Sequence, residues 1–214
     1  MPSRTPARTV IRGGLVAARA GELVPADLAI EGEVIAAIGA LDRRPNDVEI
    51  DAAGRVLLPG FIDAHCHADA TIFDPAVQLT FLRQGVTSII AGQDGVSYAP
   101  GDGAWATDYF GALNGAHPSY RGGGVEALLV GYDGTTALNA AYLVPLGTVR
   151  HEVMGMSSEP ATADQLAAMQ ALVRQGLNEG AVGVSSGLGY VPGVHADAAE
   201  LAAMCREGAA ADGV

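Results

Sequence analysis

The 214-residue sequence contains no lysine, only two cysteines and no long hydrophobic run. Cys66 and Cys205 cannot build a disulfide framework, and neither belongs to a CxxC or Cys/His zinc-finger spacing. No stretch approaches the roughly 20 apolar residues of a membrane span. The arginine-bearing N-terminus is not followed by the apolar segment and cleavage site of a signal peptide. From these absences we expect a cytoplasmic protein in a reducing compartment.

Positive charge is scarce as well. The chain has 12 basic residues against 24 acidic ones, which gives a formal net charge of −12. Such a surface repels phosphate backbones and anionic lipid, so we expect no nucleic-acid partner and no membrane association. Hydrophobic residues make up 49% of the sequence, which is enough to bury the core of a globular protein.

The first 58 residues show short alternating segments, tight turns and no helical periodicity. Two alternating arms between Ala26 and Gly39 are joined at Glu31-Gly32, and further β-type segments precede and follow them. This pattern is typical of antiparallel strands joined by hairpins. We therefore predict a small β-meander without helices from Thr9 to Leu58.

After Pro59 short apolar strands alternate with helices. FIDAH, residues 61–65, predicts a short buried strand, Asp74-Pro75 a helix start and Gly85 a helix stop, and residues 86–92 a second strand. This βαβ unit requires parallel strands and so indicates an α/β fold. The pattern recurs with a helix over 125–132, a strand over 138–145, a helix from the capping box Thr162/Gln165 to Gly180, a strand over 181–186 and a helix opened by Asp197 and Glu200. Residues 101–124 lack periodicity and are predicted to be an inserted loop.

The candidate chemistry lies in PGFIDAHCHAD, residues 59–69. On a strand that continues through this stretch, His65 and His67 would share one face and Cys66 would take the other. Asp94 follows the end of the next strand, and active sites of parallel α/β barrels lie at that end. Two imidazoles and a carboxylate suit Zn²⁺ better than Ca²⁺. The alternatives are that the histidines are ordinary core or surface residues and that Asp94 only forms a turn.

The remaining candidates have simpler interpretations. Cys66 is expected to pack as a small hydrophobic residue, and Cys205 to lie in the buried stripe of the last helix. Residues 187–193, GLGYVPG, follow a strand and form either a substrate rim or a tight turn. Three other histidines are expected to be solvated: His117, His151 and His195.

Several blocks of the sequence resemble the amidohydrolase superfamily and, more narrowly, the N-acyl-D-amino-acid deacylases (D-aminoacylases). The blocks are IDAAGRVLLPGFIDAHCHAD, GVTSIIAGQDGVSYAP, AAYLVPLGTVRHEVMG and LNEGAVGVSSGLGYVPG. The resemblance implies a metal-dependent (β/α)₈ barrel of the TIM type beside a small β-sandwich. Residues 1–58 would then be the N-terminal part of the sandwich domain, and residues 59–214 the first half of the barrel.

The resemblance also implies an activity. A zinc enzyme with one or two ions would hydrolyse the amide of a small-molecule N-acyl-D-amino acid to a carboxylate and a free D-amino acid. His65 and His67 match metal ligands, and Asp94 stands where many deacylases have a ligating cysteine. Ser186 and Tyr190 match a segment that borders the substrate.

The sequence departs from the family pattern in two ways. Leu146 stands where related deacylases have a histidine, and leucine can neither ligate a metal nor transfer a proton. Two further histidine ligands and the catalytic aspartate of the family would lie beyond Val214, so we expect an incomplete chain without activity of its own. The alternatives are another amidohydrolase, such as a dihydroorotase-like or hydantoinase-like cyclic amidase, and a noncatalytic chain that acts as a structural or partner-bound piece.

Overall fold

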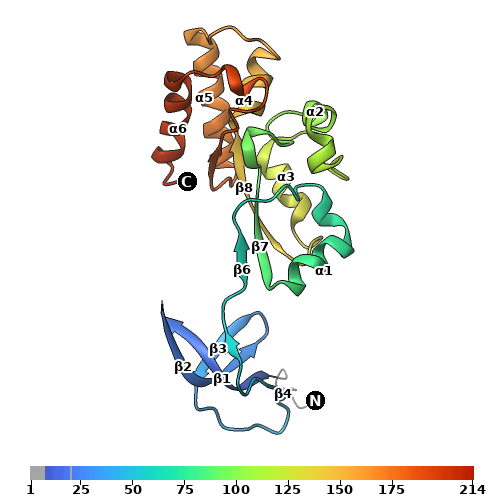
Figure 1. Ribbon diagram of the computed structural model, residues 1–214, viewed down its shortest axis with the longest axis vertical. Coiled ribbons are helices and arrows are strands. Elements are labelled where there is room, and N and C mark those ends of the chain that lie inside the picture. Colours follow the sequence, from blue (N-terminus) through green and yellow to red (C-terminus); the bar gives the residue numbers. More distant parts are fainter. Residues whose placement is uncertain (1–7, 20) are drawn as a thin grey trace, which may run out of the picture. The chain divides into compact units, whose positions relative to one another are not determined.

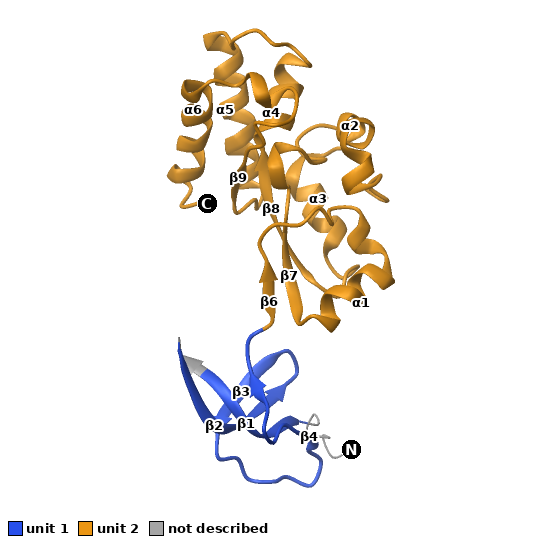
Figure 2. Ribbon diagram, in the orientation of Figure 1, with its two compact units in different colours: residues 1–59 blue, residues 60–214 orange. Residues whose placement is uncertain are grey.

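The computed structural model describes residues 8–19 and 21–214 and divides into two compact units, Met1–Pro59 and Gly60–Val214 (Figure 2). The first N-terminal arginine, Arg4, lies outside the described residues. Every helix in the described part of the chain is too short or too polar to span a bilayer.

The first unit is a five-stranded sheet. Its strands are β1 (Thr9–Arg19), β2 (Glu22–Glu31), β3 (Val34–Gly39), β4 (Val48–Asp51) and β5 (Val56–Leu57). The first three strands are antiparallel neighbours, as the meander pattern predicts. The prediction is wrong for β4 and β5, which pair with β1 in parallel. Parallel pairing requires the chain to cross over after β3, and local alternation carries no information about such a crossover.

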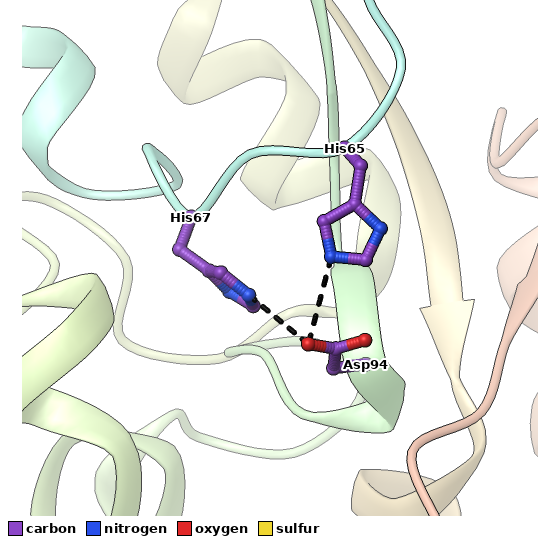
Figure 3. A group of neighbouring side chains, drawn as sticks. All are labelled: His65, His67 and Asp94. Carbon is purple, nitrogen blue, oxygen red and sulfur yellow. Dashed lines mark hydrogen bonds and ion pairs between the residues drawn. The ribbon is translucent and has the colours of Figure 1, made fainter.

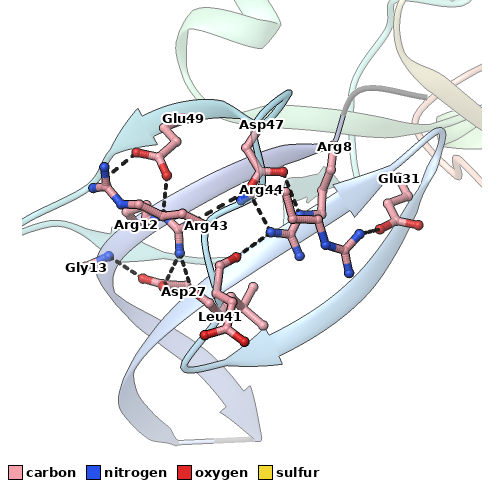
Figure 4. A network of polar contacts seen from close by, with 11 residues as sticks. Arg8, Arg12, Gly13, Asp27, Glu31, Leu41, Arg43, Arg44, Asp47 and Glu49 are labelled. Atoms are coloured by element: carbon pink, nitrogen blue, oxygen red, sulfur yellow. Dashed lines mark hydrogen bonds and ion pairs between the residues drawn. The ribbon is translucent and has the colours of Figure 1, made fainter. Parts of the chain in front are cut away.

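Arg8, which directly precedes β1, and Arg12 of β1 hold the crossover in place (Figure 4). Arg8 donates to both carboxylate oxygens of Asp47, at 2.9 and 2.6 Å, and to the carbonyl of Asp42 at 2.7 Å. Arg12 donates to Asp27 and to the carbonyl of Leu41, each at 2.7 Å. Each guanidinium group therefore donates hydrogen bonds both to a carboxylate and to a backbone carbonyl of the loop between β3 and β4.

The second unit contains a parallel four-stranded sheet in the order β6-β7-β8-β9 (Figure 1). The strands are β6 (Phe61–Asp63), β7 (Val86–Ala91), β8 (Asn139–Pro145) and β9 (Gly183–Ser185). The helices are α1 (Pro75–Arg83), α2 (Ala104–Asn114), α3 (Gly124–Tyr132), α4 (Leu146–Met154), α5 (Ala163–Asn178) and α6 (Ala198–Ala210), with 3₁₀ turns η1 (Thr71–Phe73), η2 (Gln93–Gly95) and η3 (Gly193–His195). Parallel strands in chain order, joined by helices, confirm the α/β prediction.

Helix starts follow the predicted signals. The Asp74 side chain accepts the Ala76 N–H at 2.8 Å, at the start of α1. The capping box at Thr162 and Gln165 is formed in both directions. Asp197 accepts the Glu200 N–H at 2.8 Å, at the start of α6. These short-range bonds satisfy amide groups that the first helical turn leaves free.

The strand β6 differs from the prediction in length and burial. It ends at Asp63, and the Phe61 and Ile62 side chains are 55% and 65% exposed. Within the described residues it lies at the edge of the sheet and pairs only with β7. His65 and His67 consequently lie in the loop after the strand.

Helix α2 was predicted as part of a loop, and helix α4 was not predicted. The buried positions of α2 are Ala106, Phe110 and Asn114, a stripe that includes a polar residue. The buried positions of α4 include Thr148 and Arg150. Because these stripes mix polar and apolar residues, hydrophobic periodicity does not reveal them.

The prediction for Cys205 is also wrong, because the residue is exposed on α6. The buried positions nearest to it are Ala203 and Met204. One residue advances a helix by about 100°, so Cys205 turns away from the core.

Candidate metal centre

His65, His67 and Asp94 converge at the carboxyl ends of β6 and β7 (Figure 3). The Nε2 atom of His67 lies 3.2 Å from Asp94 Oδ2, and the Nε2 atom of His65 lies 3.6 Å from the same oxygen. One ligand atom from each residue lies within 4.8 Å of the other two. The structure thus brings together the three residues that the sequence analysis singled out.

The geometry of this group fits a divalent metal ion. Ligand atoms about 2.0–2.1 Å from a tetrahedral zinc are roughly 3.3–3.4 Å apart, and the two nitrogen–oxygen distances lie near that value. The side chains are 59%, 23% and 29% exposed for His65, His67 and Asp94, so the group is open on one side. The buried Nδ1 atom of His67 has no hydrogen-bond partner in the described chain.

Asp94 occupies an unusual backbone conformation. Its φ and ψ are 55° and 25°, in the left-handed region that aspartate tolerates better than most side chains. Gly187 of the loop after β9 lies against this turn, and a Cβ atom there would be 1.9 Å from the Asp94 carbonyl oxygen. A Cβ atom at Gly95 would be 2.8 Å from the Gly187 nitrogen. Gly95 and Gly187 allow the Asp94 turn and the loop after β9 to lie in contact. This contact fixes the position of the Asp94 carboxylate.

Two buried side chains hold the same turn by hydrogen bonds. The Ser185 hydroxyl donates to the Gly92 carbonyl and accepts the Gly95 N–H at 3.1 Å. Asp69 accepts the Gly92 N–H at 2.9 Å and the Ser97 hydroxyl at 2.6 Å. Asp69 is fully buried, and this burial raises the pKa of its carboxyl group.

The histidine loop is tied to the same turn. Gln93 donates from Nε2 to the Ala64 carbonyl at 2.7 Å and to the Ile90 carbonyl at 3.0 Å. The Asp63 carboxylate accepts the His65 N–H at 3.1 Å. The histidines therefore meet Asp94 although β6 ends two residues before His65.

The predicted substrate-bordering residues lie beside the Asp94 turn. Ser186 is exposed and Tyr190 is half-buried. A Cβ atom at Gly187 would lie 1.9 Å from the Asp94 carbonyl oxygen and 3.0 Å from the Tyr190 ring, so Gly187 lies between these two groups. The Tyr190 ring also packs edge-on against Phe110, at 4.9 Å between centroids. Sequence reasoning missed Phe110 because α2 was not predicted.

Other candidates lie outside this group. Cys66 is half-buried beside the apolar core, and burial raises the pKa of its thiol to about 11. Leu146 is 2% exposed at the start of α4. The prediction of a solvated His117 is wrong, because its side chain is buried among aromatic rings. His151 is half-buried and stacks on Trp105 at 4.4 Å between ring centroids.

Comparison with known proteins decides the family. The sequence profile of the amidohydrolase family matches residues 48–213. The chain belongs to the amidohydrolase family. It is 34% identical to the N-acyl-D-glutamate deacylase of Alcaligenes xylosoxydans xylosoxydans over 94% of this chain and 41% of the deacylase. This member of the family therefore spans about two fifths of the length of that curated relative.

Solved structures of other amidohydrolases share the fold. A crystal structure of D-aminoacylase matches 97% of this chain and 44% of its own, with a TM-score of 0.83 and 33% sequence identity. The N-acyl-D-glutamate deacylase from Bordetella bronchiseptica matches 96% of this chain and 43% of its own, with a TM-score of 0.81 and 32% identity. That structure contains zinc and a phosphonate inhibitor that mimics the tetrahedral intermediate of the reaction. The match confirms the predicted fold class, a partial (β/α)₈ barrel of the amidohydrolase type.

Proposed function

We propose that this protein is a zinc-dependent hydrolase that removes the acyl group from N-acyl-D-amino acids. The observation that carries the proposal is the convergence of His65, His67 and Asp94 at the carboxyl ends of neighbouring parallel strands. Likeness to three deacylases over nearly the whole chain supports the substrate class. The substrate is a small molecule, and its products are a carboxylate and a free D-amino acid.

In this proposal His65, His67 and Asp94 hold zinc, as one ion or as part of a two-ion site. Bound zinc would lower the pKa of a water molecule to about 7 and polarise the amide carbonyl. The imidazoles would offer their Nε2 atoms, which lie 3.6 and 3.2 Å from Asp94 Oδ2. The aspartate is a harder ligand than cysteine and contributes one oxygen to the same centre.

Ser186 and Tyr190 border the substrate in this proposal. Both follow β9, whose Ser185 holds the Asp94 turn, so the loop that carries them is anchored at the metal centre. The exposed position of Ser186 leaves its hydroxyl accessible to a polar group of the substrate.

The experiment measures zinc content and amide hydrolysis for the whole protein that contains these 214 residues, called the full-length protein, and for its His67→Ala variant. Zinc content is determined by elemental analysis, and hydrolysis is followed with N-acetyl-D-methionine, N-acetyl-D-glutamate and a hydantoin. We expect His67→Ala to lower both zinc content and amide hydrolysis. His195→Ala is the matched control, since His195 is exposed in η3 and outside the group. Retention of both properties in His67→Ala would remove His67 from the site, and hydrolysis of the hydantoin alone would indicate a cyclic amidase.

A further inference from the structure

The side-chain amide of Gln93 joins β6 and β7 at the point where their backbone pairing stops. The register of these parallel strands runs as far as Asp63 with Ile89. The residues next in register are Ala64 and Ile90, and Gln93 Nε2 donates to both of their carbonyls, at 2.7 and 3.0 Å. Gln93 is 6% exposed, so these bonds are shielded from water. A side chain thus continues the connection between the two strands for one further residue.

The same contact fixes the peptide group that leads into His65. The Ala64 carbonyl, which accepts from Gln93, and the His65 N–H belong to one planar peptide unit. This N–H donates to the Asp63 carboxylate at 3.1 Å. Side chains therefore bind both polar atoms of the unit, and its orientation is fixed although it follows the end of the strand.

His65 depends on this restraint more than His67 does. Within the described residues, the His65 side chain is 59% exposed and the His67 side chain 23%. The Phe110 ring packs edge-on against His67, with centroids 5.5 Å apart. The imidazole of His65 is therefore held near Asp94 mainly through its own backbone, whereas His67 is also held by packing.

We propose that Gln93 is a positioning residue of the candidate metal centre, and that it acts by fixing the Ala64–His65 peptide group and thereby the His65 imidazole. This inference rests on the proposed function and extends it to a side chain behind the ligands. A group that is oriented before its partner binds loses less conformational freedom on binding. Hydrogen-bonding partners behind metal ligands typically change metal affinity about 10- to 100-fold.

The zinc affinity of the full-length protein and its Gln93→Met variant tests the proposal. Methionine is similar in length and volume but has no N–H to donate, so the Ala64–His65 peptide group would be released. We expect the zinc Kd, measured by competition with a chromophoric chelator, to rise about 10- to 100-fold. Gln78→Met is the matched control, because the Gln78 amide also donates to a backbone carbonyl, that of Ile72 at 2.8 Å, but lies in α1. The control should keep the parent Kd.

Urea denaturation of the metal-free proteins separates positioning from general loss of stability. Both glutamine variants remove hydrogen bonds to backbone carbonyls, so both should lower the denaturation midpoint. Only Gln93→Met should also weaken zinc binding. An unchanged Kd in Gln93→Met, or an equal rise in Gln78→Met, would overturn the proposal.

Asp63 provides a second test of the same peptide group. Asp63→Ala removes the acceptor of the His65 N–H and should raise the zinc Kd, whereas Asp63→Asn keeps an accepting oxygen and should retain most of the affinity. In Asp63→Ala/Gln93→Met the rise should be smaller than the product of the two single rises, because both side chains act on one peptide group. Rises that multiply, or equal Kd values for Asp63→Asn and Asp63→Ala, would contradict a shared restraint on His65.

The same measurements distinguish this inference from the proposed function. If the parent protein binds zinc and the variants change its Kd as expected, but no N-acyl-D-amino acid is hydrolysed, the proposed activity fails and the inference stands. If N-acetyl-D-methionine is hydrolysed while Gln93→Met keeps the parent Kd, the inference fails and the proposed function stands. A parent protein that binds no zinc would overturn both.

Discussion

The amide of Gly95 donates its N–H to the hydroxyl of Ser185 at 3.1 Å, across 90 residues of sequence. The same hydroxyl donates to the carbonyl of Gly92. A single side chain of β9 thus closes the backbone turn in which Asp94 lies, and the left-handed conformation of Asp94 is stabilised by a strand that is remote in sequence.

Replacement of Ser185 by alanine should weaken zinc binding in the full-length protein. The turn that carries Asp94 would lose the two hydrogen bonds that it makes with Ser185, and loss of such supporting contacts typically lowers metal affinity about 10- to 100-fold. Competition with a chromophoric chelator measures the effect. Ser186→Ala is the adjacent control and should keep the parent affinity; equal affinities in both variants would show that Ser185 does not position the ligand.

Removal of the Arg150 charge should destabilise the second unit strongly. Arg150 and Glu200 form an ion pair between α4 and α6, with side chains 0% and 5% exposed. Arg150→Met leaves a buried carboxylate without its partner, which costs about 3–5 kcal/mol. The double variant Arg150→Met/Glu200→Leu should recover most of this loss in urea denaturation, because neither charge then remains buried. A double variant no more stable than the single one would contradict this account.

Acid should weaken the arginine cluster of the first unit. Hydrogen bonds from Arg8 lower the pKa of Asp47 to about 2. Since this pKa lies below the ordinary aspartate value of about 3.9, the carboxylate contributes stability above pH 4 and loses it as the pH falls towards 2. Titration of the Asp47 carboxyl carbon by NMR measures the shift directly, and Asp47→Asn should flatten the dependence of stability on pH in this range. A pKa near 4 for Asp47 would rule out the proposed coupling to Arg8.

His117 should make the second unit sensitive to milder acid. Burial lowers the pKa of His117 to about 4, and its neutral Nδ1 accepts the N–H groups of Tyr120 at 2.8 Å and Ser119 at 3.3 Å. An unfolded histidine titrates at about 6.5, so folding stability should decline as the pH falls from about 6.5 to about 4. His117→Asn keeps an acceptor and does not titrate, so its urea denaturation midpoint should vary less over this range. Equal pH dependence in both proteins would mean that other groups control this transition.

Local signals in the sequence predicted much of the second unit. The Asp74-Pro75 start and the Thr162/Gln165 capping box act between residues at most three apart, so their physical cause is contained in the sequence segment itself. The prediction of parallel strands followed from their alternation with helices. The grouping of His65, His67 and Asp94 followed from the rule that parallel strands end at a common edge.

Features that depend on contacts between segments distant in the sequence could be seen only in the tertiary structure. The exposure of Cys205 follows from the phase of α6. Helix α2 was hidden because its buried stripe includes Asn114. Its packing against His67 and Tyr190 joins segments that are distant in sequence.

The sequence by itself determined which residues offer metal ligands and where most helices begin, because these properties belong to side chains and to single turns of backbone. Only the tertiary structure decided how the Asp94 carboxylate is aimed and which aromatic ring packs against His67. Ser185, Gly187 and α2 act on the site across tens of residues, through contacts that exist only after the chain has packed.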